Sequence, residues 1–318
     1  MSIVVAVSGW DPDTWAERLQ TELPTRKIQT WHEDRKFSAE ERADIRYLLA
    51  WKPPRGLCAK FPNLSVLFSL GAGVDHILQD SDLPSCPLVR VVDPDLTARM
   101  GEWIVLQTLS HLRRASQYAA QQRDLLWQPI PQPAASAVTV GVLGIGVLGL
   151  HAANLLKAIG FPVIGWGRSR KTLDGIKTFA GHSELNAFLC ETDILVSLLP
   201  HTPETEGILS IDLFRQLRGH DALGGPVLIN AGRGKTQIDH DIVQALKDGV
   251  LSGASLDVFE NEPLPMDSEL WTQPKVIVTP HVAADSDPAK LASYIAAQIR
   301  GFEERGTLHN IVDRERGY

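Results

Sequence analysis

The stretch VTVGVLGIGVLG, residues 138–149, decides the fold of the chain around it. An apolar β-type run leads into Gly144, Gly146 and Gly149 in the spacing G-x-G-x-x-G, and a helical pattern follows at once. In that context the first glycine makes a tight turn, the second lets backbone N–H groups approach a pyrophosphate, and the third lets helix and strand pack closely. The stretch therefore predicts a dinucleotide-binding turn, with the intervening residues beside the phosphates: Ile145, Val147 and Leu148.

The next predicted strand ends in GWGRSRK, residues 165–171, inside a chain whose formal net charge is −7. An acidic residue at this point would bind the ribose 2′-hydroxyl of NAD, but the strand offers none. Trp166 is followed instead by hydroxyl and cationic side chains, which can hold a 2′-phosphate: Arg168, Ser169, Arg170 and Lys171. The cluster favours NADP(H) over NAD(H), and the alternative is an exposed basic turn with no ligand.

Strand-like and helix-like segments alternate along the chain, which is typical of parallel sheets with both faces covered. The predicted strands are residues 3–8, 27–31, 45–51, 64–70, 88–92, 138–143, 162–166, 194–198, 227–230, 254–258 and 276–278. One long helix is predicted over 96–127, before the Pro-rich WQPIPQPAA at 127–135. Further helices are predicted over 13–23, 147–159, 185–190, 211–217, 239–247 and 288–305. The expected fold class is α/β with two doubly wound parallel-sheet domains.

Composition excludes several function classes. The 318 residues exceed one typical core, and a net charge of −7 disfavours a nucleic-acid partner. The three cysteines form no C-x-x-C pair, which indicates reduced thiols in a cytoplasmic protein and no metal site. The run 137–156 is apolar, but its glycines, His151 and Asn154 argue against a membrane span.

Three polar residues follow predicted strands of the second half: Arg233, Glu262 and His281. Ligands of doubly wound sheets bind beyond the carboxyl ends of the strands, so these side chains could converge on one crevice. A guanidinium suits a carboxylate, and an imidazole suits proton transfer. Taken singly, each residue is more often an ordinary loop or turn residue than a functional one.

The ordered motifs LLPHTPET (198–205), LINAGRG (228–234), LDVFENEPLP (256–265) and VTPHVAA (278–284), together with the glycine fingerprint, resemble those of the D-isomer-specific 2-hydroxyacid dehydrogenases. LLAWKPP (48–54) and SLGAGVDHIL (69–78) are similar to the glyoxylate/hydroxypyruvate reductase branch, A-type. The resemblance implies NADPH-dependent reduction of a small 2-oxo acid to the 2-hydroxy acid, such as glyoxylate to glycolate or hydroxypyruvate to D-glycerate. It also implies a homodimer that uses the long helix and its flanking arm.

The resemblance implies a catalytic triad. His281 would donate the proton to the substrate oxygen as hydride reaches the carbonyl carbon, and Glu262 would fix the ring and favour its charged form. Arg233 would pair with the substrate carboxylate and polarise its carbonyl. Backbone amides of a Gly-flanked turn form a candidate second carboxylate cradle, or simply a tight turn: Leu70, Gly71, Ala72 and Gly73. Trp51 is either a substrate contact or a core aromatic at an interface.

Further cofactor contacts carry over from the family by position. They are Met100, Leu199, Pro200, Ala231, Gly232, Arg233, Asp257, His281 and Ala283, several of which could equally serve packing or capping. The expected organisation is a Rossmann NADP-binding domain at 101–286, inserted in a flavodoxin-like substrate domain formed by 1–100 and 287–318, which closes over the substrate.

Two alternatives remain open. One is a D-2-hydroxyacid dehydrogenase of broader specificity that acts on bulkier 2-oxo acids. The other is a nicotinamide-sensing interaction module, since co-repressors resembling this fold keep the same triad. The acid at Glu262 disfavours formate oxidation, because formate-oxidising relatives carry an amide there.

Overall fold

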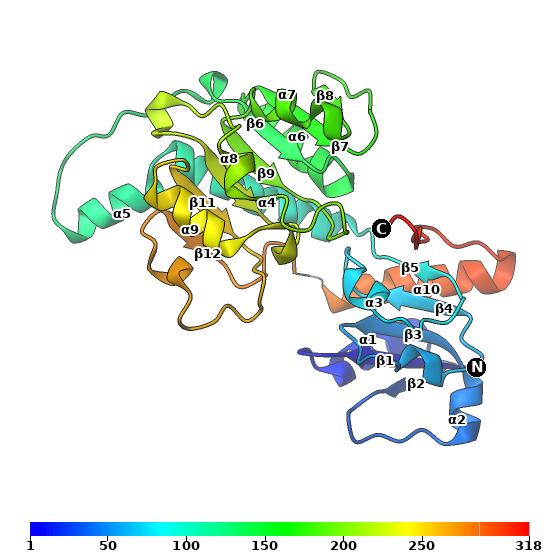
Figure 1. The fold of residues 1–318 in the computed structure, drawn as a ribbon. Helices are drawn as coiled ribbons and strands as arrows, with labels where there is room; N and C mark the ends of the chain where they lie inside the picture. The colour runs from blue at the N-terminus through cyan, green and yellow to red at the C-terminus, as the bar shows by residue number, and fades with distance from the viewer. Residues whose placement is uncertain (286, 318) are drawn as a thin grey trace. The chain divides into compact units, whose positions relative to one another are not determined.

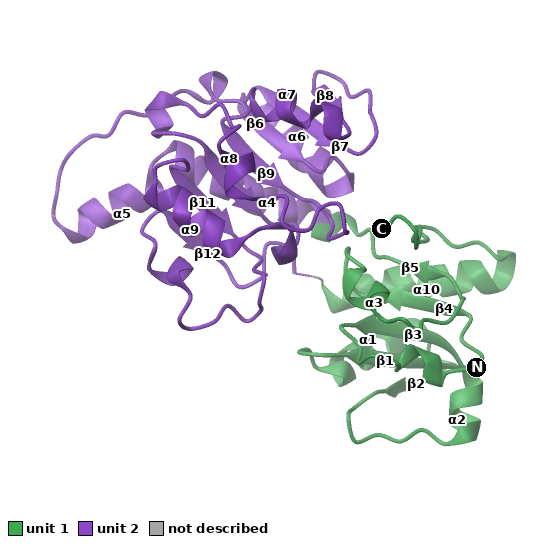
Figure 2. Cartoon of the chain, viewed as in Figure 1, with its two compact units in different colours: residues 1–96, 286–318 green, residues 97–285 purple. Residues whose placement is uncertain are grey.

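The computed structural model describes residues 1–285 and 287–317 of the chain. It divides into two compact units (Figure 2): unit 1 comprises Met1–Leu96 and Ser286–Tyr318, and unit 2 comprises Thr97–Asp285. The boundaries predicted from the sequence are 100/101 and 286/287, and residue 286 lies outside the described residues. Unit 2 is thus an insertion between two segments of unit 1.

Unit 1 is built on a five-stranded parallel sheet with the order β2-β1-β3-β4-β5 (Figure 1). The strands are β1 (Ser2–Val7), β2 (Lys27–Thr30), β3 (Ile45–Trp51), β4 (Val66–Ser69) and β5 (Leu88–Val89). This is the flavodoxin-like strand order, in which the carboxyl ends of β1, β3 and β4 lie side by side at one edge. The expected flavodoxin-like sheet is confirmed.

Apolar side chains cover both faces of the unit 1 sheet. On one face α1 (Pro12–Glu22) and α10 (Pro288–Arg305) pack together over buried residues such as Leu19 and Ile295. The other face is covered by Phe61, Ile77 and Val312, among others. The short helices of this unit are α2 (Ala39–Asp44) and α3 (Asp75–Leu78).

Unit 2 is built on a seven-stranded parallel sheet with the order β12-β11-β10-β9-β6-β7-β8 (Figure 1). The strands are β6 (Val140–Leu143), β7 (Val163–Gly167), β8 (Lys177–Ala180), β9 (Ile194–Ser197), β10 (Val227–Asn230), β11 (Gly253–Leu256) and β12 (Val276–Val278). The order reverses between β6 and β9, as in dinucleotide-binding sheets. The doubly wound α/β fold predicted from the sequence is therefore confirmed.

Helices cover both faces of the unit 2 sheet. They are α6 (Val147–Ile159), α7 (Leu185–Leu189), α8 (Ile211–Phe214), α9 (Asp239–Lys247) and most of α4 (Pro94–Leu112). A Cβ on Gly101 of α4 would lie 2.6 Å from a methyl carbon of Leu155, so the glycine lets α4 pack closely on α6. His111 of the same helix is half-buried, and its ring is hydrogen-bonded to the Ser255 hydroxyl on β11 at 2.9 Å. Burial lowers the pKa of His111 to about 4, with the charge of Arg114 contributing.

The single helix expected over 96–127 is wrong. Helix α4 ends at Leu112, and a separate helix α5 (Ala115–Arg123) follows. Arg114 between them is left-handed, with φ 60°, and its guanidinium donates to the carbonyls of Ala222 and Leu223. These tertiary hydrogen bonds favour the break, which no proline or glycine announces in the sequence. The sequence analysis also missed β8, whose four residues carry a weak apolar pattern.

Candidate active site

The glycine turn after β6 has the geometry that its spacing predicts. Gly144 has φ +106°, and a Cβ on it would lie 2.9 Å from the carbonyl of Leu198. A Cβ on Gly149 would lie 2.1 Å from the Gly144 oxygen, so this position also excludes a side chain. A Cβ on Gly146 would meet no atom within 4 Å. A side chain at Gly144 or Gly149 would therefore clash with the protein, whereas the space beside Gly146 is open. A ligand would approach the turn at Gly146.

The open side of the turn is the start of helix α6. Gly146 is the N-cap residue, and no side chain caps the first backbone N–H groups of the helix. Val147 is 47% exposed, whereas Ile145 packs in the core. An uncapped N-terminus with a partial positive charge fits a pyrophosphate in the place of a capping side chain. The residues present therefore fit a dinucleotide here.

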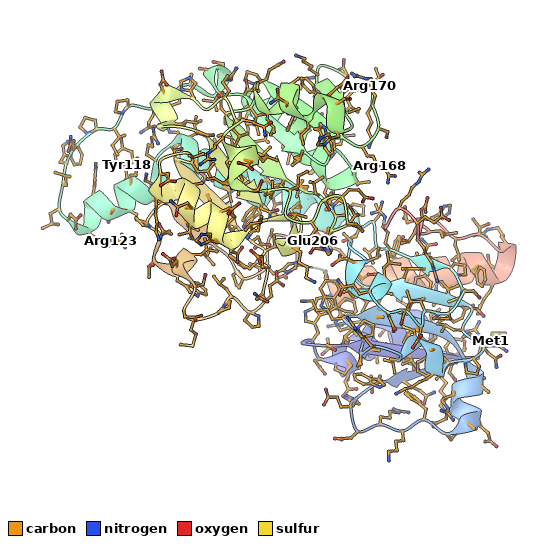
Figure 3. All side chains as sticks on the ribbon, viewed as in Figure 1. Met1, Tyr118, Arg123, Arg168, Arg170 and Glu206 are labelled. Carbon is orange, nitrogen blue, oxygen red and sulfur yellow. The ribbon has the colours of Figure 1, made fainter. Side chains whose placement is uncertain are left out.

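Cationic side chains line the loop after β7, on the side of unit 2 that β7 and β8 form (Figure 3). Arg170 donates to the carboxylate of Glu184 and to the carbonyl oxygen of Thr178, the latter at 3.1 Å. Lys171 Nζ donates to the carbonyl of Ile145 at 2.7 Å, which ties this loop to the glycine turn. Arg168 is exposed and near Glu204, whose pKa is lowered mainly by a hydrogen bond from Thr202 and in part by the Arg168 charge.

The ring of Trp166 lies in the core rather than on the basic loop. It is 9% exposed, and its Nε1–H donates to the Gly181 carbonyl at 3.0 Å. Its backbone oxygen accepts from the amides of Gly144 and Ile145. Buried side chains also occur at several other expected cofactor contacts, where contact would have to be made largely by the backbone: Met100, Leu199, Ala231 and Ala283.

His281 and Glu262 form a hydrogen-bonded pair in unit 2. The distance from His281 Nδ1 to Glu262 Oε2 is 2.8 Å, and Oε1 lies at 3.0 Å. The side chains are 33% and 23% exposed, so the pair is within reach of a ligand. Because the carboxylate engages Nδ1, Nε2 is the ring nitrogen that can exchange a proton with a bound molecule.

Asp257 holds the turn that carries His281. Its carboxylate is buried and accepts from Thr279 Oγ1 at 2.5 Å and from the amides of Val282 and Ala283 at 3.0 Å each. The His281 amide donates to the Asp257 carbonyl at 2.8 Å, and His281 itself is left-handed, with φ 57°. A non-glycine residue keeps this backbone conformation only where its surroundings fix it.

The loop carrying Arg233 follows β10 and packs against neighbouring loops. A Cβ on Gly232 would lie 2.7 Å from the Leu199 oxygen, and one on Gly234 would lie 1.7 Å from the Phe259 oxygen. The Arg233 guanidinium donates to the carbonyl of Gly232 at 2.8 Å. Since β10, β11 and β12 are adjacent in register, the loops with Arg233, Glu262 and His281 lie along one carboxyl edge of the unit 2 sheet.

Buried Asn230 braces this loop, a feature that sequence reasoning missed. Its Oδ1 accepts from the Gly232 amide at 3.1 Å, and its Nδ2 donates to Gln237 Oε1 at 2.7 Å. A polar residue at the end of an apolar strand was the available signal, because a buried amide must be hydrogen-bonded.

In the turn of unit 1 that was expected to bind a carboxylate, fewer backbone amides are available to a ligand than predicted. The Leu70 amide is paired with the Ala50 carbonyl at 3.0 Å, and the Gly71 amide lies 3.3 Å from Ser69 Oγ. The turn therefore offers chiefly the amides of Ala72 and Gly73 to a ligand. Trp51, at the end of β3, lies directly over Gly71.

Comparison with known proteins supports this reading of the fold. Residues 105–283 match the model of the family described as D-isomer specific 2-hydroxyacid dehydrogenase, NAD binding domain. The chain belongs to the D-isomer-specific 2-hydroxyacid dehydrogenase family. Within the family it is 40% identical to glyoxylate/hydroxypyruvate reductase A of Escherichia fergusonii, over the whole of both chains.

Two solved structures are similar over their full length and that of this chain. The NADPH-dependent glyoxylate/hydroxypyruvate reductase of Sinorhizobium meliloti, in complex with NADP and sulfate, is 44% identical with a TM-score of 0.93. A probable 2-hydroxyacid dehydrogenase from Rhizobium etli, in complex with NADP, HEPES and L(+)-tartaric acid, is 46% identical with a TM-score of 0.93. The resemblance to the A-type reductase branch is confirmed.

Neither a membrane-spanning helix nor a metal-binding cluster occurs in the part of the chain that the structure describes. Among residues 1–285 and 287–317, no helix has both the length and the apolar character needed to span a bilayer. The same residues contain no group of three or more His, Cys, Asp or Glu side chains arranged to hold a metal ion.

Proposed function

We propose that the protein reduces small 2-oxo acids with NADPH, converting glyoxylate to glycolate and hydroxypyruvate to D-glycerate. The observation that carries the proposal is the His281–Glu262 pair, at 2.8 Å, on the same sheet edge as the glycine turn. The NADP complexes of relatives that are 44% and 46% identical support the choice of coenzyme. When bound, the dihydronicotinamide supplies the hydride for the carbonyl carbon.

Proton delivery falls to His281 in this proposal. Its Nε2–H donates to the substrate oxygen, while the hydrogen bond from Nδ1 to Glu262 keeps the ring oriented. Arg233 pairs with the carboxylate of the 2-oxo acid and polarises its carbonyl, as a forked guanidinium can. In unit 1, the Ala72 and Gly73 amides bind carboxylate oxygens, and Trp51 contacts the small substituent of the substrate.

The glycine turn and basic loop bind the coenzyme in this proposal. The α6 N-terminus holds the pyrophosphate, and Arg168 and Ser169 hold the 2′-phosphate. Arg170 and Lys171 also belong to the phosphate site, but both already brace the loop through Glu184, Thr178 and Ile145. Asp257 would act on the nicotinamide side of the site by fixing the turn that carries His281, through the amides of Val282 and Ala283.

Steady-state assays of the purified chain test the function. NADPH oxidation is followed with glyoxylate, hydroxypyruvate, phenylpyruvate and 2-oxoisocaproate, and each assay is repeated with NADH. We expect the highest kcat/KM with NADPH and the two small acids. A strong preference for the bulky acids would establish the broader dehydrogenase instead, and NADPH binding without turnover would establish a sensing module.

The basic loop is tested by separate substitutions. Arg168→Ala removes a charge-assisted contact, which is worth about 1.5–3 kcal/mol or roughly a tenfold to hundredfold rise in KM for NADPH. The KM for NADH stays nearly constant. Arg215→Ala is the matched control, because Arg215 is an exposed arginine of unit 2 that pairs with Asp212 on α8. Equal effects on both coenzymes would contradict 2′-phosphate recognition.

We also propose that the enzyme is a homodimer joined through the arm that follows α5. Leu125 and Trp127 on this arm are 94% and 100% exposed, which is unusual for side chains of their size. Tyr118 of α5 anchors the returning arm, since its hydroxyl accepts from the Ile130 amide at 2.9 Å (Figure 3). Sedimentation velocity should give a dimer for the wild-type chain and a monomer for Leu125→Ser/Trp127→Ser, whereas an unchanged state would refute the interface.

A cytoplasmic location is part of the same proposal. The three cysteines are free thiols, one of them exposed, as expected in a reducing compartment. Cell fractionation checks this expectation, and recovery in an oxidising extracytoplasmic fraction would contradict it.

A further inference from the structure

Three stacked indoles and one edge-on imidazole form a continuous row of ring contacts at the carboxyl edge of the unit 1 sheet. Trp15 and Trp10 are stacked with centroids 5.5 Å apart, and Trp10 and Trp51 are stacked with centroids 4.9 Å apart and planes only 2° from parallel. His76 meets Trp51 edge-on at 4.6 Å. These are favourable separations for aromatic pairs. Trp51 is therefore positioned by two contacts, the parallel stacking of Trp10 and the edge-on contact of His76.

The chain delivers Trp10 to this place by regular secondary structure. Strands β1 and β3 pair with Val7 opposite Trp51, and the Ser8 amide donates to the Trp51 carbonyl at 3.0 Å. Gly9 then turns the chain at φ +80°, which brings Trp10 over the end of β3.

Helix α1 fixes Trp10 from its other side. Asp11 caps the helix, and its carboxylate accepts from Thr14 Oγ1 at 2.5 Å and from the Asp13 amide at 3.2 Å. Trp15, on the first turns of α1, is only 5% exposed and provides the surface on which Trp10 stacks. Trp10 is therefore placed by the strand before it and by the helix after it.

The stack positions Trp51 against the candidate carboxylate turn. A Cβ on Gly71 would lie 2.2 Å from Trp51 Cζ3 and 3.0 Å from Cε3, so the indole rests on the Gly71 backbone. The amides of Ala72 and Gly73 follow immediately in the chain. A ring in this position limits the space next to those amides.

We propose that Trp10 is a specificity-determining residue that acts through Trp51. It fixes the position of the Trp51 indole, and that indole limits the space for a substrate beside the Leu70–Gly73 turn. The inference rests on the proposed function, because it concerns the size of the 2-oxo acid that the turn accepts. Trp10 remains 37% exposed, so its burial alone does not explain a large aromatic here, whereas its parallel contact with Trp51 does. Trp10 is a positioning residue and does not itself touch the substrate.

The test compares Trp10→Ala with Trp10→Phe, which keeps an aromatic face for Trp51. Trp31→Ala is the matched control, because Trp31 also belongs to unit 1 but packs on the opposite face of the sheet. The readout is the ratio of kcat/KM for glyoxylate to that for phenylpyruvate, with NADPH. A loss of unit 1 stability alone lowers both values together and leaves this ratio unchanged.

We expect Trp10→Ala to lower the ratio about threefold to tenfold, the range that one stacked aromatic pair supplies. Trp10→Phe restores the ratio to near the wild-type value, and Trp31→Ala does not change it. In 5-fluorotryptophan-labelled protein, the ¹⁹F resonance of Trp51, assigned with Trp51→Phe, shifts in Trp10→Ala and stays in place in Trp31→Ala.

The two proposals fail in different ways. Turnover by wild type with an unchanged ratio in Trp10→Ala would refute the role of Trp10 and leave the proposed function intact. An unchanged Trp51 resonance in Trp10→Ala would refute it as well. Absence of NADPH-linked turnover in the wild-type chain, with any 2-oxo acid, would refute the proposed function and this inference with it.

Discussion

Asp257→Ala is expected to disorder the turn that carries His281. The buried carboxylate accepts three hydrogen bonds, from Thr279 Oγ1 and from the amides of Val282 and Ala283. Alanine leaves these donors without their acceptor in a buried site, where an unpaired polar group costs free energy. Fewer hydrogen bonds then hold the backbone of His281 in its left-handed conformation, with φ 57°.

The magnitude follows from those contacts. Each bond to a charged acceptor contributes about 1.5–3 kcal/mol in isolation. The three share one carboxylate and are not additive, so we expect a loss of about 3–6 kcal/mol in the free energy of unfolding of unit 2. For a unit of this size, that is a fall of roughly 6–24 °C in Tm. We expect kcat to fall at least about a hundredfold, since even a small displacement of the imidazole has an effect of that order.

Calorimetry and steady-state kinetics at a temperature well below the melting transition measure the two effects separately. Thr279→Val is the matched control, because it removes one donor and leaves the two amide bonds to Asp257 in place. It should lose no more than about a third of the stability lost in Asp257→Ala. If Asp257→Ala kept its Tm within about 3 °C of wild type and its kcat within tenfold, the reasoning would be refuted.

Two further predictions concern charge. Glu262→Gln lowers kcat/KM about tenfold to hundredfold, the worth of one charged hydrogen bond, because the carboxylate that engages His281 Nδ1 is replaced by a neutral amide. Steady-state kinetics with NADPH and hydroxypyruvate measure the loss, and an unchanged kcat/KM would count against the pair. His111 is half-buried and has a pKa of about 4 against 6.5 for a free imidazole, so between about pH 6.5 and pH 4 the unfolded chain binds a proton that the native state does not. Stability should therefore fall as pH drops from 6.5 towards 4, by at most about 1.4 kcal/mol per pH unit from this group. Melting temperatures of wild type and His111→Asn across this range test it, and the same slope in both would show that another group is responsible.

Much of the fold could be predicted from the sequence because its signals are local. The strand 45–51 and the helices 147–159, 239–247 and 288–305 have the predicted bounds, since each combines a strong apolar pattern with a cap or turn residue. The break at Arg114 could not be predicted, because it depends on hydrogen bonds to Ala222 and Leu223, more than a hundred residues away. Tertiary contacts of this kind leave no local pattern.

The candidate site also has some features that could be predicted from the sequence and others that could not. The glycine turn could be predicted from its spacing, because Gly144 adopts a positive φ in the turn from strand to helix and Gly149 lies against the Gly144 oxygen. The hydrogen-bonding of Asp257 to the His281 turn could not be predicted from spacing, nor could the stacking of Trp10 on Trp51. Both depend on which strand ends are neighbours in the sheet, and strand order emerges only from the folded chain.

The central claim is that the imidazole at position 281 delivers the proton while the coenzyme delivers hydride. Its most direct test measures kcat for hydroxypyruvate reduction and the Kd for NADPH in His281→Ala and in wild type. The account predicts a loss of kcat of at least about a thousandfold, within the range for general acid catalysis, with Kd changed by less than about threefold. Retention of kcat within tenfold of wild type, with NADPH binding equally well, would contradict it.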